Sequence, residues 1–320
     1  MEPIRWNENE LILLDQRELP NKICYVTCNN VSDVYNAIKK MIVRGAPAIG
    51  VTAAYGLVLA IKDYKQDKKE SELEHLKKAA KMLASSRPTA INLKWALSKM
   101  IFKAENCASD NLIDLLLNEA ISIHNSDLEG NYKMGGIGAK MISPNSSVIT
   151  HCNAGALATS GYGTALGVLR KASQDGNIEK IYVTETRPWL QGSRLTASEL
   201  IYDKLSVTIV VDSAAGYLMS SEHIDWVIVG ADRVTMNGDV INKIGTYNLA
   251  IIAKKHSVKF MVVAPTSTID LAMESGSDVS IEHRDEEEIK YFNNQLIAPK
   301  NASAFNPVFD VTPNLSLIHI

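Results

Sequence analysis

The sequence predicts an α/β protein with a doubly wound parallel sheet in its C-terminal part and a smaller, mainly helical N-terminal part that bears short strands. At 320 residues the chain exceeds the size at which one hydrophobic core usually keeps growing, which indicates two domains. Helical spacing dominates from Ser32 to about Leu117, and strand-like segments recur after about residue 145. We expect an N-terminal domain over residues 1–120 and a sheet domain over residues 121–320.

In the N-terminal domain, residues 1–30 mix polar and β-type residues around a Leu-Pro-Asn turn and predict short strands. A helix capped by Ser32 should follow. Its apolar face consists of Val34, Ala37, Ile38, Met41 and Ile42. The longest apolar run, residues 46–61, is too short for a membrane span and predicts a buried helix. The charged residues 62–78 predict a solvated helix with a connecting loop.

Five short apolar segments predict the strands of the C-terminal domain. They are residues 147–151, 180–184, 207–211, 226–230 and 259–264. Strands that alternate with helix-length segments favour a parallel sheet. Ligands of such sheets bind at the carboxyl ends of the strands. The residues that follow each strand are therefore the first candidates for function, among them His151-Cys152-Asn153 and Ala231-Asp232-Arg233.

Composition and charge narrow the class of protein. A net charge of −3 gives no overall basis for binding nucleic acid or an anionic membrane. The N-terminus lacks the basic and apolar segments of a secretory signal. The four cysteines, Cys24, Cys28, Cys107 and Cys152, are too few and too irregularly spaced to predict a disulfide framework or a zinc site. We expect a cytoplasmic protein that binds neither nucleic acid nor membrane.

Two arginines stand just before predicted helices. Arg44 precedes Gly45 and Ala46, and the proline that follows suits a first helical turn. Arg87 precedes a proline ahead of the next helix. A guanidinium group beside a helix N-terminus forms an anion site, so both arginines predict phosphate recognition. The alternative for each is an exposed or capping arginine.

Cys152 and Asp232 are the candidates for chemistry. Cys152 leaves a strand and enters a segment rich in Gly and Ala, where helix N–H groups can favour proton transfer by a thiol. Asp232 stands two residues past an apolar strand, where partial desolvation suits general acid–base work. The alternatives are a buried core cysteine and an aspartate that pairs with Arg233 or caps a helix.

Three further residues predict ligand contacts. Asn242 and Lys243 stand ahead of another predicted helix, and Lys243 can hold a phosphate as a point charge. Gln191, in a polar segment after a strand, can bind a hydroxyl group, although a plain loop is the alternative. No Walker loop, H-E-x-x-H, G-x-S-x-G or EF-hand pattern occurs. The residues alone predict an α/β enzyme that acts on a small phosphorylated ligand.

Together these segments resemble the methylthioribose-1-phosphate isomerase family. The matching stretches are VRGAPAIGVTAAYGL, SRPTAINLKWAL, CNAGALATSGYGTALGV, ETRPWLQGSRLTASEL, VIVGADRVTMNGDVINKIGTYNLA and NPVFDVTP, in family order. The resemblance implies catalytic roles for Cys152 and Asp232. It implies substrate contacts at Arg44-Gly45-Ala46, Arg87, Gln191 and Asn242-Lys243. It also implies a Rossmann-like C-terminal domain, a homodimer without metal or cofactor, and a place in methionine salvage.

Related proteins supply the alternatives. Ribose-1,5-bisphosphate isomerases share the fold and the Cys/Asp pair, and 5-deoxyribose 1-phosphate is another conceivable substrate. Regulatory subunits of the translation-initiation guanine-nucleotide exchange factor share the fold without this chemistry, and the presence of Cys152 and Asp232 argues against that role. Two departures stand out. Ser198 replaces an expected large aromatic residue, and residues 315–320 suggest a truncated or misread end.

The implied reaction must begin with ring opening, because a sugar 1-phosphate holds no free aldehyde. We expect Asp232 to act as the acid at the ring oxygen and Cys152 to assist the move of hydrogen from C2 to C1. That hydrogen can move as a proton through an enediol or directly as hydride. The sequence favours hydride, because the surroundings of Cys152 are apolar and His151 should point away from it if the strand continues.

Overall fold

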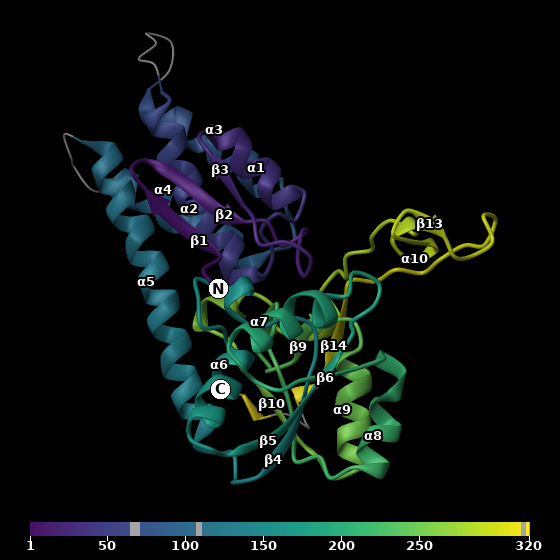
Figure 1. Ribbon diagram of the computed structural model, residues 1–320. Coiled ribbons are helices and arrows are strands. Elements are labelled where there is room, and N and C mark those ends of the chain that lie inside the picture. Colours follow the sequence, from purple (N-terminus) through teal and green to yellow (C-terminus); the bar gives the residue numbers. More distant parts are fainter. Residues whose placement is uncertain (65–70, 107–110, 315–317, 320) are drawn as a thin grey trace. The chain divides into compact units, whose positions relative to one another are not determined.

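The computed structural model describes residues 1–64, 71–106, 111–314 and 318–319. Cys107, residues 315–317 and residue 320 lie outside this set. The chain folds into two compact units (Figure 1). The first comprises Met1–Met134, Gly155–Gly167 and Pro265–Thr268, and the second comprises Gly135–Ala154, Val168–Ala264 and Ile269–Ile320. The boundary expected at residue 120 falls within helix α5 (Leu112–Ala139), so that division stays a prediction.

The first unit combines a small antiparallel sheet with helices. Its strands are β1 (Ile4–Asn7), β2 (Glu10–Leu14) and β3 (Tyr25–Cys28), paired in that order. Its helices are α1 (Val31–Lys39), α2 (Ala46–Lys62), α3 (Glu72–Ala84), α4 (Ile91–Asn106) and most of α5. Every residue of α2 from Ala46 to Ile61 is buried, which confirms the predicted buried helix.

The predicted cap of the first helix was wrong. Asn30 caps α1, and its side-chain oxygen accepts the N–H of Asp33 at 2.9 Å. Ser32 already lies within the helix. Because a capping side chain bonds the amide two or three residues ahead, Asn30 stands at the right spacing to cap Asp33. The Asp33 carboxylate in turn accepts from the N–H of Asn29 at 3.0 Å.

The second unit is built on a parallel sheet. In spatial order its strands are β6 (Thr208–Val210), β5 (Ile178–Thr184), β4 (Ser146–Thr150), β7 (Trp226–Val229), β10 (Lys259–Val262) and β15 (Ile318–His319). All pairings are parallel. Numbered along the chain, the order is 3-2-1-4-5-6, that of Rossmann-like sheets. All five predicted strands are present, which confirms the doubly wound fold.

Helices cover both faces of this sheet. Phe260 and Val262 of β10 belong to a core shared with α8 (Ala215–Ser221) and α9 (Thr246–Lys255). Met261, which alternates with them, faces Gly138 at the end of α5. Helix α6 (Ala165–Gln174) contributes Val168 to the same contact, and α7 (Ala197–Tyr202) follows β5 in the chain.

A smaller sheet completes the second unit. It contains, in order, β11 (Ile269–Asp270), β8 (Arg233–Thr235), β9 (Val240–Lys243) and β14 (Phe309–Thr312). A short helix α10 (Glu287–Lys290) leads into the hairpin β12 (Tyr291–Phe292) and β13 (Gln295–Leu296). Within the residues that the structure describes, no helix is long and apolar enough to span a membrane.

Candidate active site

Cys152 and Asp232 follow two adjacent strands at the point where the strand order reverses. Strand β4 pairs with β5 on one side and with β7 on the other, with Thr150 opposite Ile228. Cys152 stands just beyond β4, and Asp232 just beyond β7. Crevices at such reversal points are the usual ligand sites of open parallel sheets. The second unit therefore places both predicted catalytic residues where its fold favours ligand binding.

The backbone turns sharply at Cys152. Its φ of +60° lies in the left-handed region, which a residue with a side chain adopts at some cost. The Cys152 N–H donates to Thr186 Oγ1 at 2.9 Å, and its carbonyl accepts from Thr196 Oγ1 at 2.5 Å. Strand β4 thus ends before Cys152, and the side-chain alternation expected for a continuing strand does not apply. The Cys152 thiol is buried and in no disulfide.

His151 holds the structure beside this turn. Its Nε2 lies 2.9 Å from the carbonyl oxygen of Ile244, and its Nδ1 lies 2.6 Å from Thr184 Oγ1. Because a carbonyl only accepts, Nε2 carries the hydrogen, and Nδ1 accepts from the Thr184 hydroxyl in the neutral ring. Burial lowers the pKa of His151 and favours this neutral form. Both nitrogens are therefore engaged with the protein.

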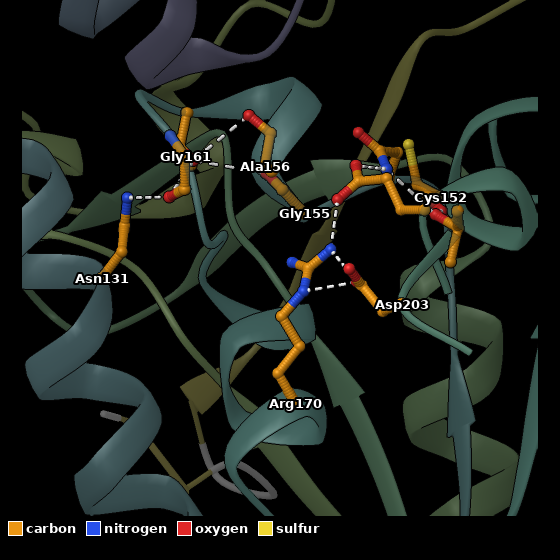
Figure 2. Close-up of polar contacts among 11 residues, drawn as sticks. Asn131, Cys152, Gly155, Ala156, Gly161, Arg170 and Asp203 are labelled. Carbon is orange, nitrogen blue, oxygen red and sulfur yellow. Dashed lines mark hydrogen bonds and ion pairs between the residues drawn. The ribbon is translucent and has the colours of Figure 1, made fainter. Parts of the chain in front are cut away.

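A buried polar network supports the residue after Cys152. Asn153 donates to Glu199 Oε1 at 2.9 Å, and the other oxygen of Glu199 accepts from Arg170 at 2.8 Å. The Arg170 guanidinium also bonds Asp203, through Nε at 2.7 Å (Figure 2). Satisfied networks of this kind rigidify their surroundings. Glu199 stood in the quoted stretch ETRPWLQGSRLTASEL, but no pattern in the sequence pointed to Arg170 or Asp203.

Gln191 opens a single π-helical turn, Gly192–Thr196. Its side chain is 5% exposed, and its Oε1 has no hydrogen-bond partner among the described residues. A Cβ on Gly192 would lie 1.7 Å from the Thr184 carbonyl oxygen, so only glycine fits there. A buried acceptor that lacks a donor suits a ligand hydroxyl, and this role of Gln191 stays a prediction. Ser198, in place of the expected aromatic residue, donates its hydroxyl to the Arg194 carbonyl at 2.6 Å.

Asn242 and Lys243 lie side by side on β9 and are both buried. The Asn242 amide donates to Thr246 Oγ1 at 2.9 Å, and that hydroxyl donates to the Lys243 carbonyl at 2.7 Å. The Lys243 ammonium lies 5.2 Å from the centre of the Phe309 ring. A buried ammonium favours an anionic partner. The pair stands just before α9, as the sequence predicted.

Sequence reasoning missed Asp310. Its Oδ2 accepts the N–H groups of Gly245 at 2.7 Å and Tyr247 at 3.1 Å, at the N-terminus of α9. Burial raises the pKa of Asp310 to about 6, although these bonds and the nearby Lys243 oppose the rise. The residue stood in the quoted stretch NPVFDVTP, which was the available signal.

The first unit contains the two candidate phosphate-binding arginines, Arg44 and Arg87. Gly45 caps α2 with a φ of +99°, and a Cβ there would lie 2.5 Å from Ala158 Cα. Ala158 belongs to the short turn Ala156–Ala158. The Gln16 side chain donates to the Leu157 carbonyl in this turn at 2.7 Å. Arg44, Gly45 and Ala46 therefore lie at a helix start that packs on residues 156–158, part of the Gly- and Ala-rich segment.

The helices that follow the two arginines start close together. A Cβ on Gly50, in the first turns of α2, would lie 2.8 Å from the carbonyl oxygen of Asn92 at the start of α4. Arg44 precedes α2, and Arg87 precedes α4. Two helix N-termini with their partial positive charges, each preceded by an arginine, favour the predicted anion site.

These features define an α/β protein with a Rossmann-like parallel sheet and two helix starts that each follow an arginine. Residues 42–320 match the model of the initiation factor 2 subunit family, and the chain belongs to this family. It is 50% identical to a methylthioribose-1-phosphate isomerase of Carboxydothermus hydrogenoformans over 98% of this chain and 92% of that protein. The resemblance inferred from the sequence is thus confirmed.

Two solved structures are similar over nearly the whole chain. The 5-methylthioribose 1-phosphate isomerase of Pyrococcus horikoshii superposes with a TM-score of 0.91 at 42% identity, over 99% of this chain and 89% of that one. A structure described as translation initiation factor eIF-2B, subunit delta, from A. fulgidus gives a TM-score of 0.87 at 43% identity, over 99% and 93%.

Proposed function

We propose that this protein is an isomerase that converts 5-methylthioribose 1-phosphate to 5-methylthioribulose 1-phosphate in methionine salvage. The observation that carries the proposal is the placement of Cys152 and Asp232 beyond adjacent strands at the reversal point of the sheet. Relatives about half identical to this chain are named as isomerases of this sugar phosphate. In this reading Gln191 binds a sugar hydroxyl.

Cationic side chains and amide groups of the protein bind the substrate phosphate in this proposal. We assign Arg44, Gly45, Ala46, Arg87, Asn242 and Lys243 to it. Adjacent helix starts support the arginine assignment, and the buried ammonium of Lys243 supports the other. We also propose a cytoplasmic homodimer, on the family resemblance; sedimentation equilibrium measures that mass directly.

The reaction proceeds in three balanced steps. Asp232 donates its proton to the ring oxygen as the bond from that oxygen to C1 breaks. The hydrogen on C2 moves with its electron pair to C1, while Cys152 stabilises the charge that develops. The C2 hydroxyl then loses its proton to the Asp232 carboxylate and becomes the ketone. The hydride route gains support from His151, since both of its ring nitrogens are engaged with the protein.

The test is turnover of 5-methylthioribose 1-phosphate by the purified protein in deuterated water. Cys152→Ser and Asp232→Asn should bind the substrate yet lose roughly a hundredfold or more in kcat. Cys24→Ser, a cysteine outside the site, is the matched control and should keep full activity. Near wild-type kcat in either site variant contradicts the residue assignment. Substantial deuterium at C1 of the product contradicts the hydride route.

The two alternatives predict different results. Faster turnover of ribose 1,5-bisphosphate or 5-deoxyribose 1-phosphate would change the substrate but keep the isomerase class. The absence of turnover with all three sugars would favour a non-catalytic regulatory subunit. The A. fulgidus structure is named as a subunit of a translation initiation factor.

A further inference from the structure

The segment between β9 and α9 is held from two sides. On one side His151 donates to the Ile244 carbonyl, and its ring lies 3.1 Å from where a Cβ on Gly245 would stand. On the other side Asp310 accepts the N–H groups of Gly245 and Tyr247. Gly245 has a φ of +101°, so the turn needs glycine as well as these contacts.

Strand β14 carries Asp310 alongside the proposed phosphate contacts. It pairs antiparallel with β9, with Asp310 opposite Asn242 and Phe309 opposite Lys243. The Lys243 ammonium lies over the Phe309 ring, and Lys243 acts electrostatically on Asp310. One short strand thus contacts the backbone that follows Lys243 and also packs against its side chain.

A helix cap alone does not require a carboxylate here. Serine, threonine or asparagine caps an N-terminus without the cost of burying a charge. Asp310 is half-buried, and its buried Oδ1 has no hydrogen-bond partner within the described part of the chain. A negative charge at this place favours the charged form of the buried Lys243 ammonium.

We propose that Asp310 is a positioning residue that fixes residues 242–247 and the charge of Lys243, so that Asn242 and Lys243 meet the substrate phosphate in a preset geometry. The inference rests on the proposed function, because it takes the phosphate as the ligand of Lys243. Asp310 itself does not need to contact the substrate.

The experiment compares Asp310→Ala and Asp310→Asn with Asp239→Ala. Asp239 is the matched control, since it also accepts two backbone N–H groups, from Gly276 and Asn314, both at 3.1 Å, but in another turn. Asp310→Ala should raise KM by roughly tenfold or more and change kcat by less than about threefold. Asp310→Asn, which keeps one acceptor oxygen, should give a smaller rise, and Asp239→Ala should leave KM unchanged.

A double-mutant cycle separates positioning from simple stabilisation. In a Lys243→Ala background, Asp310→Asn should have little further effect on KM. An unchanged KM in both Asp310 variants, or full additivity with Lys243→Ala, would overturn the inference. If Asp310→Ala does not fold, Asp310→Asn and the double-mutant cycle still test whether Asp310 positions the phosphate contacts.

Binding of inorganic phosphate, followed by calorimetry, provides a readout independent of turnover. Phosphate binding that weakens in Asp310→Asn but not in Asp239→Ala supports the inference even if the wild-type protein isomerises no sugar, in which case the proposed function alone fails. Equal phosphate affinity in the wild type and both variants contradicts the inference that Asp310 is a positioning residue.

Discussion

Gln191 holds a buried carbonyl oxygen that has no donor among the described residues. Such a group costs about 1–3 kcal/mol of folding free energy, and a ligand hydroxyl recovers that cost on binding. If Gln191 binds a substrate hydroxyl as proposed, the residue lowers the stability of the free protein and favours ligand binding.

We predict that Gln191→Met raises or preserves the free energy of unfolding without ligand and lowers kcat/KM by about ten- to hundredfold. Methionine has a similar shape but no amide to bind a hydroxyl. Urea unfolding and steady-state kinetics measure the two effects. Gln174→Met, on an exposed glutamine of α6, is the control and should change neither. A kcat/KM within about twofold of wild type would remove Gln191 from the substrate contacts.

At the level of residues, the sequence predicted the candidate site residues that follow strands. It did not predict the residues that form hydrogen bonds to them. Cys152 and Asp232 stood out because apolar strands precede them. Thr186, which accepts from the Cys152 amide, lies 34 residues further along the chain. Asp310 accepts a hydrogen bond from the amide of Gly245, which lies 65 residues away in the sequence. Partners at such separations depend on the folded topology, which a local pattern does not contain.

At the level of elements, strands with a local apolar pattern were predicted, and strands that depend on distant pairing were not. Strands β4 and β7, at the centre of the large sheet, are buried at every residue, and their apolar residues form a local pattern that the sequence reveals. Strand β14 joins β9 from a distant part of the chain, and no local pattern contains that pairing. For the segment before α9, the sequence therefore predicted only that it leads into a helix.

Two neighbouring residues of α6 allow a sharp test of the buried network. Arg170→Ala leaves the buried Glu199 and the nearby Asp203 without their cation, so we predict a loss of about 3–5 kcal/mol in the free energy of unfolding. Lys171→Ala breaks an exposed ion pair with Asp175 and should cost less than about 1 kcal/mol. Chemical denaturation compares the two, and similar losses would contradict the structural role of the network.

At the scale of the whole molecule, each compact unit contains a histidine whose pKa burial lowers, His124 in the first and His151 in the second. Burial favours the neutral form of both in the fold, whereas the unfolded chain protonates them near the usual pKa of about 6.5. The unfolded state then binds more protons, so their contribution to stability is complete above about pH 7 and is lost as the pH falls below 6.5.

We predict that His124→Gln flattens part of this fall, because glutamine does not take up a proton in the unfolded chain. Thermal unfolding between pH 8 and pH 5, read as the difference between wild type and variant, isolates the effect from Asp310, whose raised pKa acts in the opposite direction. The exposed His256 provides the control variant, His256→Gln. A pH profile of His124→Gln parallel to that of wild type would contradict the prediction.

The path of the chain also bears on how such a protein can evolve. The chain passes from one unit to the other after residues 134, 154, 167, 264 and 268. Gene fusion and exon shuffling move continuous stretches of sequence, and neither unit is one. A gene fragment for residues 1–134 would lack Gly155–Gly167, and with it the turn that packs on Gly45. Neither unit can therefore be transferred as one continuous stretch of sequence without part of the other.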